Sequence, residues 1–132
     1  MALYREAHPH ISFKVEEVSE IPQLNLDKSQ IKRVLLNLID NAIAAMDGHG
    51  SVTIALSFDQ DSNRVRLGIS DTGTGISPED KGHLFEPDFS TKKTGMGLGL
   101  SIVNAIVEDH NGSIKVEDNH PTGSRFVVEL PA

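Results

Sequence analysis

Two hydrophobic periodicities alternate along the chain, and their order restricts the fold more than any other feature of the sequence. Residues 10–18 alternate apolar and polar side chains, as in a strand with one buried face. Residues 27–46 then carry apolar side chains at helical spacing, and Asp27 followed by Gln30 predicts a helix N-terminus. A strand followed by a long amphipathic helix is therefore the first predicted unit.

The same two patterns recur to the end of the chain. They predict a hairpin, a loop with one short helix, a second long helix that ends at Asn111-Gly112, and two final strands. This order is typical of an α+β protein, a two-layer α/β sandwich with a mixed or antiparallel sheet. The predicted ranges after the first helix are 52–58 and 65–69 for the hairpin, 78–85 for the short helix, and 114–116 and 125–130 for the last strands.

Composition limits the classes of function. With 132 residues, 38% of them hydrophobic, we expect one domain over residues 1–132. The absence of Cys excludes disulfides and Cys-based zinc or redox sites and fits the cytoplasm. A net charge of −7 argues against nucleic acid as a partner. Because the chain has no apolar run of about 18 residues and no signal-peptide pattern, we expect no membrane contact.

Two carboxamides lie one turn apart on the first predicted helix. Asn37 and Asn41 project from the same side of that helix, at the edge of its apolar stripe. Amide oxygens can ligate Mg²⁺ while phosphate and water oxygens complete its octahedron. The alternative is that both are solvated surface residues.

An acidic residue followed by glycines ends the second hairpin strand. Asp71 at a strand end can accept a hydrogen bond from an exocyclic amine such as adenine N6, and Gly73 and Gly75 let a planar ring approach the backbone. A simple Asx turn formed by Asp71 and Gly73 is the structural alternative.

Three glycines stand at the entrance of the second long helix. Gly95, Gly97 and Gly99 lie where free N–H groups and the helix dipole favour anions, and Lys92 and Lys93 precede them. Close helix packing and a solvated lysine pair are the alternatives. The spacing fits neither a Walker A loop nor a dinucleotide fingerprint. The six scattered histidines lack the spacing of a helical metal site, and none is assigned a catalytic role.

Read together, these segments resemble the ATP-binding catalytic domain of sensor histidine kinases, within the wider group of gyrase, Hsp90, kinase and MutL ATPases. Asn37–Ala42 is similar to the N box of this family and Asp71–Ile76 to its G1 box. Leu84–Lys92 is similar to the F box and Gly95–Leu100 to the G2 box. The resemblance extends from about residue 11 to residue 130 and is strongest to the nitrogen-regulation branch.

The resemblance implies the Bergerat fold, in which a mixed sheet of about five strands packs against three helices beneath an ATP lid. It implies that Asn41 ligates Mg²⁺, that Asp71 holds the adenine amine, and that Phe85 and Phe89 anchor the lid. The implied nucleotide-binding residues are Asn37, Asn41, Asp71, Gly73, Gly75, Ile76, Lys92, Gly95, Gly97, Leu98, Gly99, Leu100 and Ser124.

The chain departs from the family pattern at two positions. Ala44 replaces a basic residue that many members carry, so neutralisation of the phosphates relies on the lid lysines. Asp88 stands where an aromatic residue is common in the F box, which bears on the packing of the lid.

The resemblance also bears on the reaction. Asn37 stands where hydrolysing relatives carry a Glu that activates water, and an amide cannot act as a general base. We therefore expect transfer of the γ-phosphoryl group to a histidine on a separate dimerisation domain. The receiver domain of a response regulator then takes the phosphoryl group from that histidine. This fragment, expected to be monomeric, should not phosphorylate itself. The rival functions are a degenerate binding module without transfer and an anti-sigma type serine kinase.

Overall fold

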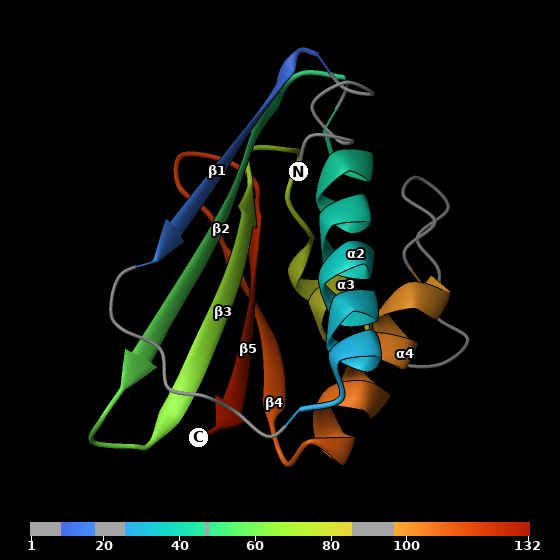
Figure 1. The fold of residues 1–132 in the computed structure, drawn as a ribbon. Coiled ribbons are helices and arrows are strands. Elements are labelled where there is room, and N and C mark those ends of the chain that lie inside the picture. The colour runs from blue at the N-terminus through green and yellow to red at the C-terminus, as the bar shows by residue number, and fades with distance from the viewer. Residues whose placement is uncertain (1–8, 18–25, 47, 86–96) are drawn as a thin grey trace.

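A computed structural model describes residues 9–17, 26–46, 48–85 and 97–132, and gives side chains in these ranges except at residues 97–99. These segments form five strands and three helices, in the predicted order (Figure 1). The elements are β1 (Ile11–Glu17), α2 (Lys28–Ala44), β2 (Gly50–Asp59), β3 (Arg64–Asp71), α3 (Pro78–Lys81), α4 (Gly97–Asp109), β4 (Ser113–Asp118) and β5 (Ser124–Pro131).

The sheet is mixed, with the strand order β1-β2-β3-β5-β4. β1 pairs in parallel with β2, whereas every other neighbouring pair is antiparallel. Parallel neighbours cannot be joined by a tight turn, and α2 provides the connection from β1 to β2. The β2–β3 hairpin confirms the antiparallel pair predicted from the sequence, with Val52 opposite Asp71 at one end and Asp59 opposite Arg64 at the other.

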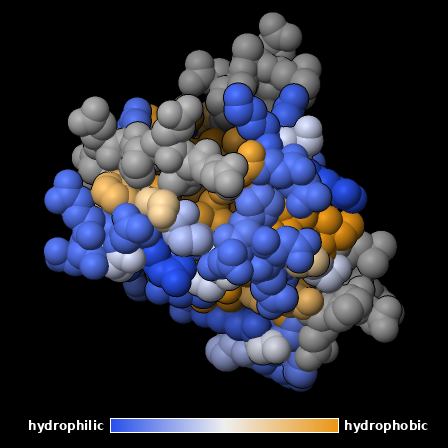
Figure 2. Space-filling model, turned by 60° about the horizontal axis from the view of Figure 1, so that its bottom comes forward, coloured by the Kyte–Doolittle hydropathy of each residue, from blue (hydrophilic) through white to orange (hydrophobic). Residues whose placement is uncertain are grey.

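The helices α2 and α4 lie on one face of the sheet, which gives the predicted two layers (Figure 1). Leu38 on α2, Val103 on α4 and Ile69 on β3 are among the buried residues that fill the space between the layers. Hydrophilic residues cover most of the end of the molecule shown in Figure 2, with apolar residues between them. Among the described helices, none is long and apolar enough to cross a membrane.

Local signals at the helix ends act as the sequence predicts. Asp27 is the N-cap of α2, because its Oδ1 accepts hydrogen bonds from the backbone N–H groups of residues 29 and 30, at 3.0 and 3.2 Å. Asn111 follows α4 with a φ of 61°, and the N–H of Gly112 bonds back to the Val107 carbonyl at 2.9 Å. His110 joins the two ends, since its Nε2 accepts from the Asp27 N–H at 3.2 Å.

The short helix is shorter than the sequence predicts. α3 ends at Lys81, and residues 82–85 form turns that carry Leu84 into the core. Phe85 then contacts Phe126 of β5 edge to face, with ring centroids 6.4 Å apart. The F-box phenylalanine Phe85 is thereby fixed to the sheet, whereas Phe89 and Asp88 lie outside the described residues.

Candidate functional site

Asp71 occupies the end of β3 as a buried carboxylate with only 2% of its surface exposed. Its Oδ1 accepts from the backbone N–H of Gly73 at 2.9 Å and from that of Ser124 at 3.3 Å. Its Oδ2 accepts from the Ser124 hydroxyl at 3.4 Å. The Asx turn considered from the sequence is therefore present, and it uses only one of the two carboxylate oxygens.

Burial acts on the pKa of this carboxyl group. Loss of solvation raises the pKa of Asp71 above its ordinary value, and the hydrogen bonds from Gly73 and Ser124 offset that rise only in part. The group is therefore easier to protonate than an exposed aspartate.

The loop after Asp71 is held against the end of α2. The N–H of Thr74 donates to the Ala45 carbonyl at 3.2 Å. A Cβ on Gly73 would lie 2.3 Å from the same carbonyl oxygen, so only glycine fits at this position. The first G1-box glycine thus brings the loop within contact of the helix that carries the two asparagines.

The two asparagines of α2 differ in their surroundings. Asn41 is 8% exposed, and its buried Nδ2 has no hydrogen-bond partner among the described residues. Asn37, one turn earlier, is half-buried. A buried amide without a partner is uncommon, because the lost hydrogen bond costs about 1–3 kcal/mol. The Nδ2 of Asn41 is a donor that suits a phosphate oxygen. Rotation of the same amide presents its oxygen to Mg²⁺.

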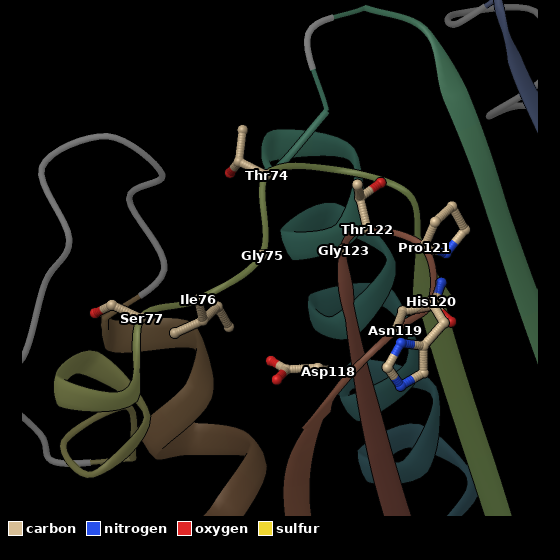
Figure 3. Close-up of a pocket in the computed structure, with 10 residues that line it drawn as sticks. All are labelled: Thr74, Gly75, Ile76, Ser77, Asp118, Asn119, His120, Pro121, Thr122 and Gly123. Atoms are coloured by element: carbon tan, nitrogen blue, oxygen red, sulfur yellow. The ribbon is translucent and has the colours of Figure 1, made fainter.

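A cavity of about 540 Å³ lies between the loop after Asp71 and the turn that joins β4 to β5 (Figure 3). Gly75, Ile76 and Ser77 form one wall, and residues 118–123 form the other. Figure 3 shows the side chains of Ile76 and Asp118 directed into the space between the two segments. Two of the predicted nucleotide-binding residues, Gly75 and Ile76, line this cavity. Asn37, Asn41 and Asp71 do not line it.

The G2 residues are described only in part. Lys92 and Gly95 lie outside the described residues, and so does Lys93. Gly97, Leu98 and Gly99 form the first turn of α4, so the predicted helix entrance is confirmed at this place. Leu100 is fully buried in the core that α4 shares with the sheet, and Ser124 is fully buried beside Asp71.

The sequence interpretation missed two residues of the β4–β5 turn. Asn119 donates through Nδ2 to the backbone carbonyl of Asp71 at 2.7 Å, and Thr122 donates through its hydroxyl to the carbonyl of Thr72 at 3.2 Å. The sequence indicated only a polar turn before Gly123-Ser124. Its sole signal was that Asn and Thr carry side-chain donors in a turn next to a predicted site residue.

Comparisons with known proteins show which family and which solved structures the chain is similar to. The family described as histidine kinase-, DNA gyrase B- and HSP90-like ATPase matches residues 26–132. The sensor histidine kinase ZraS of Escherichia coli is 38% identical over 111 residues, which are 84% of this chain and 23% of that protein. The chain therefore spans about a quarter of such curated relatives.

Solved structures show the same fold. The catalytic domain of the histidine kinase ThkA superposes with a TM-score of 0.87 and 37% identity, covering 98% of this chain and 87% of that one. The histidine kinase ThkA in complex with the response regulator protein TrrA gives a TM-score of 0.82 at 34% identity, over 98% of this chain and 37% of that one.

Proposed function

The chain belongs to the family of histidine kinase-, DNA gyrase B- and HSP90-like ATPases, and we propose that it donates the γ-phosphoryl group of ATP to a histidine of a separate dimerisation domain. In this proposal it is the catalytic domain of a cytoplasmic or membrane-anchored sensor kinase, acts in the cytoplasm, and is monomeric by itself. Its other partner is the receiver domain of a response regulator, the kind of protein bound in the ThkA–TrrA complex.

The observation that carries the proposal is the environment of Asp71. An ionised carboxylate has about four accepting positions, and three hydrogen bonds from Gly73 and Ser124 occupy most of them. The remaining capacity suits one N–H donor, such as the exocyclic amine of adenine. A buried, fixed acceptor of this kind selects a base that has an amine over one that lacks it.

The phosphate end of the proposed site is on α2. Asn41 would hold Mg²⁺ and Asn37 would contact the phosphates, with Lys92 as a further proposed contact. The metal, when bound, would neutralise phosphate charge. Because Asn37 has no basic group, the chain has nothing there to activate water. It would instead act by orienting ATP and by electrostatic stabilisation of the transferred group.

Titration calorimetry tests nucleotide binding. We expect ATP to bind more tightly with Mg²⁺ than without it, and Asp71→Asn to weaken ATP binding about tenfold or more, because a charged hydrogen bond contributes about 1.5–3 kcal/mol. Asp59→Asn is the matched control, since Asp59 lies at the opposite end of the same hairpin. Equal affinity in the wild type and Asp71→Asn would contradict the adenine contact.

Labelled ATP tests transfer. The chain, mixed with the dimerisation domain of the same kinase, should place acid-labile phosphate on that domain, and the chain alone should acquire none. Tight ATP binding without any transfer to the added domain would instead identify a nucleotide-binding module.

A further inference from the structure

The β4–β5 turn extends the pairing of β3 beyond the regular sheet. Backbone pairing between β3 and β5 ends at Ser70 and Arg125. One residue further along β3, the side chain of Asn119 donates to the Asp71 carbonyl at 2.7 Å, although the two residues are 48 positions apart in sequence. The turn therefore contacts the last residue of β3 through a side chain where the regular ladder has stopped.

Asn119 also fixes the shape of its own turn. Its backbone N–H donates to the Gly123 carbonyl at 3.0 Å. Gly123 has a φ of +101°, and a Cβ there would lie 2.0 Å from the Asp71 carbonyl oxygen and 2.8 Å from Oδ1. Asn119 thus closes the turn through its backbone N–H, and its side chain holds the turn in direct contact with the backbone and carboxylate of Asp71.

The same turn delivers the donors that orient the carboxylate. Ser124 follows Gly123 directly and supplies both a backbone N–H and a hydroxyl to Asp71. The Thr122 hydroxyl adds a bond to the carbonyl of Thr72, the residue after Asp71, at 3.2 Å. In Figure 3 the Thr122 side chain points to the segment that leads into Thr74. A displaced turn would move Ser124 and rotate the acceptor that it holds.

We propose that Asn119 is a positioning residue that sets the orientation of Asp71 and, through it, the preference of the site for a base with an exocyclic amine. This inference rests on the proposed function, since it concerns the contact with adenine. Asn119 acts on the base through Asp71 in this scheme, because its side-chain amide is bonded to the Asp71 carbonyl. Its effect is expected in base selectivity, because a hydrogen bond to a buried acceptor depends steeply on the geometry of that acceptor.

Paired affinities for ATP and purine riboside triphosphate, which lacks the amine, separate positioning from general support. Calorimetry on Asn119→Ala should show ATP binding weakened about tenfold, with less than about twofold change for the analogue. Asn63→Ala is the control, because the Asn63 side chain also donates to a backbone carbonyl, that of Ala132 at 3.2 Å, but lies at the opposite end of β3 and does not line the cavity. It should leave both affinities unchanged.

Thr122→Val provides a second variant that keeps the side-chain shape and removes only the hydroxyl, and it should lower ATP affinity by about threefold through the same route. If Asn119→Ala does not fold, the same pair of affinities on Asn119→Ser, which removes the amide donor and keeps a small polar side chain, decides the question. Equal losses for ATP and the analogue, or no loss, would overturn the positioning role and leave the proposed function intact. Failure of the unsubstituted chain to bind ATP would overturn the proposed function and the positioning role with it.

Discussion

The end of β3 and the asparagine-bearing turn of α2 are both buried and polar, but they differ in how far the chain itself completes them. Asp71 receives three hydrogen bonds from Gly73 and Ser124 and a fourth, to its carbonyl, from Asn119. Asn41 keeps a buried Nδ2 without any partner among the described residues. In the proposed function, the protein itself preorganises the end that would hold the base (the base end), whereas the ligand would complete the end that would hold the phosphates (the phosphate end).

The largest effect should come from breaking the contact at the preorganised end. Gly123→Ala would place a Cβ 2.0 Å from the Asp71 carbonyl at a φ of +101°. We expect a loss of about 3 kcal/mol in the free energy of unfolding, measured by urea denaturation. Gly82→Ala is the control, because its Cβ would lie 3.6 Å from the nearest atom, the Glu79 carbonyl oxygen. A loss in Gly123→Ala no greater than that in the control would contradict a close-packed base end.

At the phosphate end we expect a change of the opposite sign, a gain in the free energy of unfolding. Asn41→Leu replaces an unpartnered buried amide by an apolar group of similar size, so the free energy of unfolding should rise by about 1 kcal/mol. Binding of ATP with Mg²⁺ should fall below detection in calorimetry. Asn104→Leu is the control, since that amide already bonds Glu108 at 3.4 Å and should show no comparable gain. A destabilised Asn41→Leu would mean that Asn41 supports the fold.

Because the pKa of Asp71 is raised, the stability that this residue contributes should depend on pH. Because the folded carboxyl binds its proton more tightly than the unfolded one, its contribution to stability is fully present below the ordinary value of 3.8. That contribution is lost as pH rises through the raised folded value. Urea denaturation between about pH 3 and about pH 7 should show wild type losing stability relative to Asp71→Asn as pH rises. A constant difference between the two proteins would contradict this.

The smallest effect concerns an ion pair that links α3 to the far wall of the cavity. Lys81 bonds Asp118, and their side chains are 23% and 63% exposed. Lys81→Met should cost about 0.5 kcal/mol in thermal or urea unfolding and leave ATP affinity unchanged, because solvent screens the pair. Lys115→Met, which removes the more exposed pair with Glu117, should cost less still. A change in ATP affinity in Lys81→Met would mean that α3 also contributes to the base end.

Local patterns in the sequence were sufficient for the elements and many of their ends. Apolar periodicity predicted β1, α2, α4 and the β2–β3 hairpin, and Asp27 and Asn111 marked helix ends where the structure has them. Asp71 was correctly placed at a strand end and Asn41 at the border of the apolar stripe. Each of these features depends on residues within a few positions of one another, which is why the sequence alone determined them.

Contacts between distant segments depended on the tertiary structure. The parallel pairing of β1 with β2, the end of the β3–β5 ladder at Ser70, and the bond from Asn119 to Asp71 join residues that lie far apart in the chain. No local pattern specifies which turn will meet which strand end, because that depends on strand order and register across the whole sheet. The sequence determined that an aspartate would end β3, and only the folded sheet decided that Asn119, Gly123 and Ser124 would hold it in place.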